Sequence, residues 1–231
     1  RLQPPSLASG HPLGTDALGR DILARLLVGA RISLLIGLAG ALVAGAVGVV
    51  LGVLAGWLPG RVDVAIAWAI DVQMALPFVV VAIVATATFG PGLRNVLLTL
   101  TVTGWVGYAR VMRLQTRSLR RAQWVEAATA LGASPIWQIT HHVAPHLAGV
   151  AAILVTQQVS AMILYEASLS FLGLGVGGDA ITWGGMAAEG RDLLLTAPWV
   201  CLIPGGAVAV VVLGLTLLGD AVATAGPRMR R

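Results

Sequence analysis

The sequence predicts an all-α, polytopic membrane protein with five transmembrane helices, and three observations lead to that class. Hydrophobic residues make up 57% of the 231 residues and charged residues only 11%, whereas about 25% of a typical soluble domain is charged. The mean hydropathy is +0.87. Five stretches approach the roughly 20 apolar residues with which a helix crosses a bilayer. A soluble domain is therefore excluded. The sequence also lacks a basic patch with interleaved aromatic residues, the pattern that would indicate nucleic-acid binding.

The first two spans are predicted over residues 32–58 and 64–89. The first contains no charged residue, and the second is interrupted only by Asp71 and Gln73. We expect Asp71 to pair with a basic residue of a neighbouring helix, although an ionisable residue at membrane depth is also a functional candidate. Small residues recur at every fourth position of the first span, namely Gly40, Ala44, Gly48, Gly52 and Gly56. They form one face of a helix, against which another helix can pack closely.

The third and fifth spans are less regular. The third, 96–112, is apolar only as far as Arg110, so we expect that side chain to reach toward the interface or to mark the end of the span. The fifth, 193–218, contains Pro198 and Pro204. Proline lacks a backbone N–H, so these residues should kink the helix or delay its start.

The fourth span, 147–165, carries Gln157 and Gln158 near its centre. Consecutive helix positions point about 100° apart, so at least one amide should face protein or a water-filled path rather than lipid. Glu166 follows at the outer end of the span, where it is either interfacial or faces the mouth of such a path. We therefore predict that Gln157, Gln158 and Glu166 are the candidates for lining a translocation path.

Arginine, which supplies all 15 basic residues, predicts the orientation. One group ends the third span and another ends the chain: Arg110, Arg113, Arg117, Arg120 and Arg121, then Arg228, Arg230 and Arg231. Two spans separate the groups, so both lie on one side, which the positive-inside rule makes cytoplasmic. The C-terminus is thus expected in the cytoplasm and residues 1–31 outside. A further helix before this chain would return the N-terminus to the cytoplasm.

A polar loop, VEAATALGASPIWQITHHVAPH (125–146), separates the third and fourth spans. Its chemistry predicts two short helices that meet at a corner. Residues 123–131 favour a helix, and Gly132 can adopt the left-handed conformation that ends it. Ser134 can cap the next helix, Pro135 suits its first turn, and Pro145 starts the following span. Local chemistry alone favours an inert interfacial elbow over a surface that pushes on a partner.

The loop resembles the EAA signature of permease subunits of bacterial ABC importers. The similarity lies in Glu126, Ala127 and Ala128, followed by Gly132 and the closing proline. Other stretches are similar to the C-type permeases of the dipeptide/oligopeptide/nickel branch: HPLGTDALGRDILARLLVGARISL (11–34), DVQMALPF (71–78), GWVGYARVMR (104–113), EASLSFLGLGV (166–176) and WGGMAAEGRDLLLTAPW (183–199). The family usually closes the loop with Leu-Pro and Asn, whereas Ala144, Pro145 and His146 stand here.

The resemblance implies a fold, a location and a set of partners. The family has six spans, one of them before the HPLGTD segment, in the bacterial inner membrane. Its partners are a homologous B-type permease, two cytoplasmic ATPase subunits, an extracytoplasmic substrate-binding protein and membrane lipid. The loop at about 119–145 would be the coupling helix that docks on an ATPase. The implied coupling residues are Glu126, Ala127, Ala128, Gly132, Ser134 and Pro135.

The resemblance also implies that this chain is not itself an enzyme. It lacks the GxxxxGK[ST] phosphate-binding loop, so ATP and Mg²⁺ are expected on the partner ATPases and no cofactor on this chain. Three histidines, His141, His142 and His146, include a spacing that metal sites use, but no carboxylate or thiol stands nearby in sequence. We expect an interfacial role for them and no metal site.

The loop at about 168–198 is too polar to span the membrane and is expected outside, within a transmembrane domain of residues 32–231. Its Glu189, Arg191 and Asp192 could form part of the surface on which a binding protein docks. A self-contained cap of salt bridges explains the same residues equally well. The sequence does not distinguish the two.

Short peptides are the cargo that the family implies, with nickel, glutathione or another small solute as the alternative. A more remote alternative is an ion-coupled carrier or channel without an ATPase, for which only Asp71 and Glu166 could serve. A membrane-embedded enzyme would need a nucleophile and base, or metal ligands, clustered at one depth. The sequence contains no such cluster.

Overall fold

The computed structural model describes residues 1–8, 10–178 and 180–225, and it confirms the all-α class. Within those ranges the structure has no strand, and two isolated bridges, Ser6 with His11 and Thr15 with Asp21, lie in the N-terminal segment. The elements are α1 (Ile22–Trp57), α2 (Arg61–Ala75), α3 (Phe78–Phe89), α4 (Leu93–Arg120), α5 (Gln123–Ala130), α6 (Pro135–Gln138), η1 (Ile139–Val143), α7 (Ala144–Phe171), α8 (Trp183–Glu189), η2 (Arg191–Leu193) and α9 (Trp199–Ala225).

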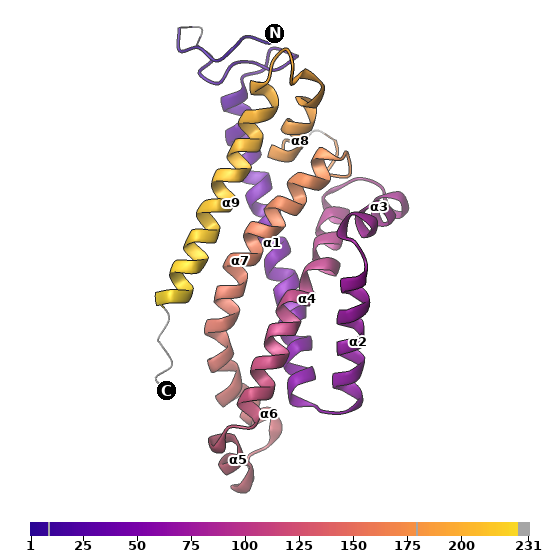
Figure 1. The fold of residues 1–231 in the computed structure, drawn as a ribbon, viewed down its shortest axis with the longest axis vertical. Helices are drawn as coiled ribbons and strands as arrows, with labels where there is room; N and C mark the ends of the chain where they lie inside the picture. Colours follow the sequence, from indigo (N-terminus) through magenta and orange to yellow (C-terminus); the bar gives the residue numbers. More distant parts are fainter. Residues whose placement is uncertain (9, 179, 226–231) are drawn as a thin grey trace.

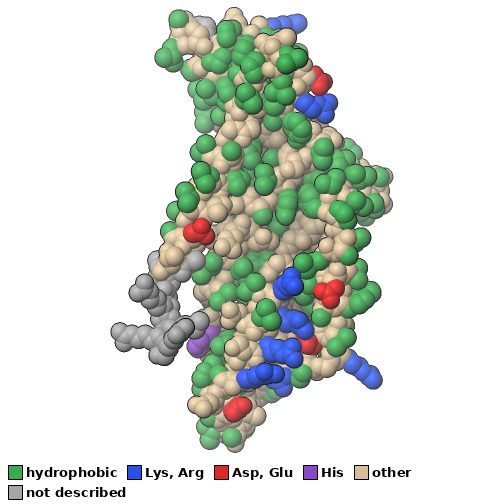
Figure 2. Space-filling view, viewed as in Figure 1, with side chains coloured by type: hydrophobic (Ala, Val, Ile, Leu, Met, Phe, Trp, Pro, Cys, Tyr) green, Lys and Arg blue, Asp and Glu red, His purple; other side chains and the backbone are tan. Residues whose placement is uncertain are grey.

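The helices form an elongated bundle with two different ends (Figure 1). The N-terminal segment and α8 lie at one end, which we call the cap end, and α5 and α6 lie at the other, which we call the loop end. The chain descends through α1, returns through α2 and α3, descends again through α4, rises through α7 and descends through α9. On the face that Figure 2 shows, a group of arginines lies toward the loop end, as the positions of the arginines in α4 predict, and others lie at the cap end.

Helix α1 begins ten residues earlier than the predicted start of the first span. Asp21 caps it, with Oδ1 accepting hydrogen bonds from the backbone N–H groups of Leu23 at 2.7 Å and Ala24 at 3.3 Å. At 36 residues the helix is about 54 Å long, and the hydrocarbon core of a bilayer measures about 30 Å. The prediction identified the apolar part of α1 and missed the turns that extend beyond it.

The predicted second span is not one continuous helix. Helices α2 and α3 meet at 89° across a short break. Pro77 disfavours the helical conformation of the residue before it, and Leu76 is accordingly extended, with φ −90° and ψ 119°. The sequence reading treated this proline as part of the apolar run, and that was the error.

Among the described residues, three helices are long and apolar enough to cross a membrane by themselves, and a fourth crossing appears if α2 and α3 are taken together. The three are α1, the continuous helical stretch from α6 to the end of α7, and α9. Helix α4, which contains the predicted third span, is not among these helices, and arginines occupy its C-terminal half. Helix α9 starts directly after Pro198, so this proline delays the helix, while Pro204 lies inside it.

Helix α4 packs along the small-residue stripe of α1, which confirms the predicted contact face. A methyl group added to Gly52 would lie 2.6 Å from the carbonyl oxygen of Ala109, and one added to Gly56 equally close to that of Arg113. Tyr108 is fully buried in this interface and donates a hydrogen bond to the carbonyl oxygen of Ala41 at 2.9 Å. The two backbones therefore approach as closely as glycine permits.

We predict that Gly52→Ala weakens the bundle although alanine is the better helix former. The added methyl must push α4 away, and overpacking of this kind costs about 1–3 kcal/mol. Thermal unfolding in detergent should show a lower midpoint. Gly149→Ala in α7 is the matched control, because no atom lies within 4 Å of the added methyl. Equal midpoints for the two variants would contradict the close α1–α4 contact.

Candidate functional site

The loop between α4 and α7 is a rigid corner, as its local chemistry predicts. Gly132 has φ +85°. The N–H of Ala133 bonds the carbonyl of Ala128, and the N–H of Gly132 bonds that of Thr129, both at 3.0 Å. This is the glycine-dependent pattern that ends a helix in a Schellman motif. It closes α5 and turns the chain by a fixed amount.

The second arm of the corner is capped as predicted. The hydroxyl of Ser134 accepts a hydrogen bond from the N–H of Trp137 at 3.3 Å, and Pro135 occupies the first turn of α6. Sequence reasoning missed Gln138, whose buried amide donates to the carbonyl of Ala133 at 2.8 Å and to Thr129 Oγ1 at 3.2 Å. This amide ties the second arm to the first. The available signal was a polar residue three positions after Pro135, within the predicted second helix.

The outer surface of the corner exposes two large apolar side chains. Leu131 is 89% exposed and Ile136 is 75% exposed. Glu126 and Ala127 are also exposed, and Ala128 is half-buried. Beside them, a pocket of about 580 Å³ is lined by α5 and α6 residues and by Trp57 of α1. The outer surface of the ordered corner is therefore partly apolar.

The three histidines lie at the base of the corner, packed on two tryptophans. His146 stacks on Trp124 with ring centroids 5.3 Å apart, and His141 stacks on Trp137 at 4.9 Å. His142 contacts both tryptophans edge-on. No group of three or more potential metal ligands occurs in the part of the chain that the structure describes.

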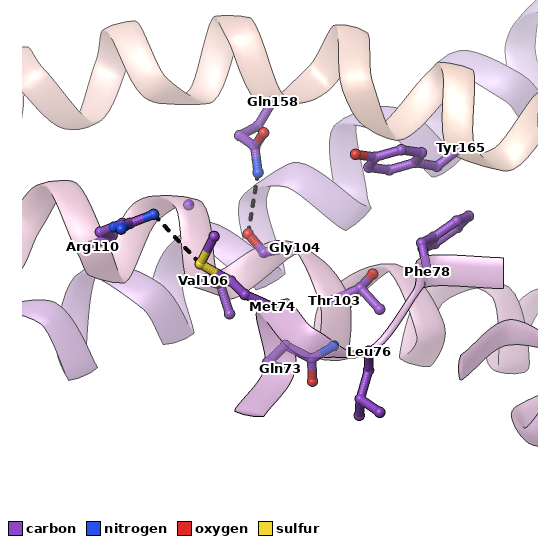
Figure 3. Close-up of a pocket in the computed structure, with 11 residues that line it drawn as sticks. Gln73, Met74, Leu76, Phe78, Thr103, Gly104, Val106, Arg110, Gln158 and Tyr165 are labelled. Atoms are coloured by element: carbon purple, nitrogen blue, oxygen red, sulfur yellow. Dashed lines mark hydrogen bonds between the residues drawn. The ribbon is translucent and has the colours of Figure 1, made fainter. Parts of the chain in front are cut away.

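A polar groove of about 300 Å³ lies between α2, α3, α4 and α7 (Figure 3). Gln158 lines it and donates a hydrogen bond from Nε2 to the carbonyl of Gly104 at 3.1 Å. Gln157, the other predicted path residue, is exposed on the α9 side of α7, near Gly219. Only Gln158 of this pair therefore faces the groove.

Glu166 does not reach the groove or an open surface. Its side chain is fully buried, with Oε1 accepting a hydrogen bond from Ser170 at 2.7 Å and Oε2 accepting one from Ser33 at 3.5 Å. Ser33 in turn accepts from the N–H of Trp183 at 3.1 Å. The sequence placed Glu166 either at the interface or at the mouth of a path. The structure corrects both to an interior position, where the carboxyl group links α1, α7 and the start of α8.

An ion-pair cluster holds the cap end together. Arg25 is nearly buried and donates to Asp16 Oδ2 at 2.7 Å and to both carboxylate oxygens of Glu189, at 2.6 and 2.8 Å. Arg20 bridges the same two carboxylates, at 2.6 Å to Asp16 and 3.1 Å to Glu189. Glu189 therefore takes part in a self-contained cap. Sequence reasoning missed its partners because they lie more than 160 positions away.

The other two predicted docking residues are more exposed. Arg191 and Asp192 pair with one another at 3.2 Å, with side chains 55% and 85% exposed. In the cap itself, burial raises the pKa of Asp16, but hydrogen bonds from Arg20 and from the N–H of Leu18 outweigh it and hold that pKa below 3.8. The hydrogen bond from His11 likewise lowers the pKa of Asp21. Both carboxylates are therefore charged at neutral pH.

The polar groove, the rigid corner and the bundle together describe a transport subunit of the membrane, and comparison with known families agrees. Residues 48–231 match the family described as binding-protein-dependent transport system inner membrane component. The chain belongs to this family.

Several curated relatives are peptide-transport permeases. The chain is 37% identical over 230 residues to the dipeptide transport system permease protein DppC of Bacillus subtilis, covering 99% of this chain and 71% of that protein. It is 36% identical over 216 residues to the oligopeptide transport system permease protein OppC of Escherichia coli, covering 94% and 72%. The chain is thus similar to C-type permeases over nearly all its length.

The fold also matches a solved importer. An inward-facing structure of the MetNI methionine ABC transporter contains a chain that superposes with a TM-score of 0.73, covering 90% of this chain and 98% of that one. A second crystal form gives a TM-score of 0.69. The sequence identities are 18% and 19%, so these matches establish the shared fold alone.

We predict that Arg25→Gln destabilises the protein at neutral pH. The variant removes one of the two arginines that pair with buried Asp16 and leaves Arg20 as its remaining partner, so the loss should be below the about 3–5 kcal/mol that breaking a buried ion pair from one side costs. Thermal unfolding in detergent measures the loss. Arg191→Gln removes an exposed arginine that pairs with a carboxylate, and as the control it should change stability by about 0–1 kcal/mol.

Acid provides a second check on the same cluster. The folded-state pKa of Asp16 lies below its ordinary value of 3.8, so its contribution is complete above that value and is lost as the pH falls through the folded pKa. Because Arg25 attracts the charged form of Asp16, the difference in unfolding free energy between wild type and Arg25→Gln should narrow below about pH 4. A gap that does not change with pH would show that packing of the arginine stem, rather than charge, holds the cap.

Proposed function

We propose that this chain is one of two homologous permease subunits of an ATP-driven importer, and that it forms half of a translocation path for short peptides. Residues 1–31 and the loop 168–198 lie outside the cell, and the loop 119–145 and the C-terminus lie in the cytoplasm. Residues 228, 230 and 231, which helped to predict this orientation, are outside the described part of the chain. The arginines of α4 at the loop end support it.

The corner carries the proposal. It places Leu131 and Ile136, 89% and 75% exposed, at the loop end of the bundle (Figure 1). A glycine turn and the Gln138 amide fix the angle between its two arms. An apolar surface held this rigidly can transmit a push from a cytoplasmic ATPase to α4 and α7, between which it lies. ATP and Mg²⁺ would be bound on the partner chains.

Transport would then follow from movement of whole helices. When the ATPases close on ATP, each would carry a corner with it, and the two permeases would rock to open the path alternately to each side. Gln158 would line this path because its amide borders the polar groove. Arg191 and Asp192, exposed at the cap end, would meet the binding protein. Peptide cargo is favoured by the names of the relatives.

A single cysteine at Ala128 tests the coupling role. After Cys201→Ser, Ala128→Cys should cross-link to an ATP-hydrolysing subunit when the assembled transporter is treated with a short bifunctional reagent. Mass spectrometry of the product identifies the partner. A cysteine at Leu195, which is 99% exposed in the loop between η2 and α9, is the control and should capture no ATPase. Peptide transport without any ATPase would instead support an ion-coupled carrier.

Gly132→Val should uncouple transport from ATP hydrolysis. No atom lies within 4 Å of an added Cβ, so we expect the substitution to act through the left-handed backbone, which a β-branched residue adopts at a cost of about 1–2 kcal/mol. Two quantities measured in proteoliposomes should fall together: the stimulation of ATPase activity by peptide, and the uptake of peptide. Gly132→Asn is the control, because asparagine tolerates this conformation, and it should retain coupling. Full activity of the valine variant would count against the corner as the coupling element.

A further inference from the structure

The polar groove has three different kinds of lining along its length (Figure 3). Arg110 lies at one end, toward the loop end of α4. The rings of Phe78 and Tyr165 lie at the other, stacked with centroids 4.5 Å apart. Between them are uncharged polar side chains that can donate and accept hydrogen bonds: Gln73, Thr103 and Gln158.

Arg110 differs from the two arginines that follow it on α4. Arg113 bonds Asp63 at 2.5 Å, and Arg117 lies 3.8 Å from the same carboxylate. Arg110 instead contacts the sulfur of Met74 at 3.5 Å, and thioether sulfur is a weak acceptor. Within the described residues, no carboxylate lies within 4.0 Å of the Arg110 guanidinium. Its positive charge is therefore available to a ligand in the groove.

The Arg110 side chain is exposed where it borders the groove, so an anion can reach its guanidinium. A guanidinium is also suited to a carboxylate, which it binds through two parallel hydrogen bonds. The amides and hydroxyl beyond it match a peptide backbone, which has both donors and acceptors. The aromatic pair can cover an apolar side chain. Along the groove the guanidinium, the polar side chains and the aromatic pair follow one another. Along a short peptide, read from its C-terminus, the carboxylate, the peptide bond and the side chain of the preceding residue follow one another in the same order.

We propose that the groove is a transient binding site for the free α-carboxylate end of a short peptide, with the carboxylate on Arg110 and an apolar side chain against Phe78 and Tyr165. The proposal rests on the proposed function and deepens it by naming the chemical group that the path recognises. At about 300 Å³ the groove is at the small end of ligand sites. It accommodates one end of a peptide, and the partner permease would face the remainder.

A cysteine beside Arg110 tests this charge directly. Gly107 lines the groove one helical turn from Arg110, and an added Cβ would meet the Gln158 amide at an ordinary 3.6 Å. In the assembled transporter with Cys201→Ser, Gly107→Cys is treated with a negatively charged and a positively charged methanethiosulfonate. At about 6 Å in a water-filled groove, Arg110 should change each rate about threefold, in opposite directions. Arg110→Gln should thus lower the anion-to-cation rate ratio about tenfold.

Three variants make the result specific. Arg110→Lys retains the charge and should largely keep the ratio. Arg94→Gln removes an exposed arginine from the first turn of the same helix, outside the groove, and should leave the ratio unchanged. Thr103→Cys is a second reporter in the groove, which serves if Gly107→Cys does not assemble. An unchanged ratio in Arg110→Gln would overturn the proposal and place the guanidinium at the lipid interface.

Protection by ligand tests the carboxylate. Phe-Ala should slow modification of Gly107→Cys, and its C-terminal amide should not. Arg110→Gln should abolish the protection. Equal protection by acid and amide, or none by either, would refute carboxylate recognition. These measurements require no ATP, so their failure is distinct from failure of the proposed function. Absence of ATP-driven peptide uptake in the wild-type complex would refute the latter.

Discussion

The close approach of α1 and α4 is the contact on which the rest of the molecule depends. Both helices are long, and α4 carries arginines that would be unfavourable against lipid. Glycines of α1 let the α4 backbone lie almost against it, with Tyr108 buried between them. The arginine-bearing part of α4 is thereby held in place, with Arg113 paired to Asp63 of α2 and Arg110 facing the groove. The chain leaves α4 directly into the corner.

The two ends of the bundle are made rigid by different chemistry. At the loop end, backbone geometry and local hydrogen bonds around Gly132 and Gln138 fix the corner, and large apolar side chains point outward. At the cap end, charges drawn from distant parts of the chain converge, so that Asp16, Arg25 and Glu189 tie the N-terminal segment to α8. A rigid bundle between two fixed ends is suited to rocking as a unit, because displacement at one end is not absorbed by the loops.

Polar side chains of the bundle divide into those that are paired within the chain and those that border open space. Glu166 satisfies its carboxylate within the chain, through serines of α1 and α7. Gln158 and Arg110 border open space, and among the described residues the polar contact of Arg110 there is with the sulfur of Met74. From the sequence, these residues could be judged only by their position along a span. That position does not distinguish a side chain paired within the chain from one that borders open space. What separates them is whether a neighbouring helix supplies a partner, since an unpaired polar group is costly in an apolar environment.

The sequence by itself determined the helical membrane class, the stripe on α1 and the corner at Gly132, Ser134 and Pro135. Each follows from local rules: apolar run length, four-residue spacing, and the capping preferences of glycine, serine and proline. Pro77 could have been read as a break by the same rules. Only the tertiary structure decided that Glu189 joins Arg25, that Glu166 is interior and that Arg110 faces a groove with Tyr165. Those relationships depend on which helix faces meet, and residues far apart in the chain acquire neighbours only when the helices pack.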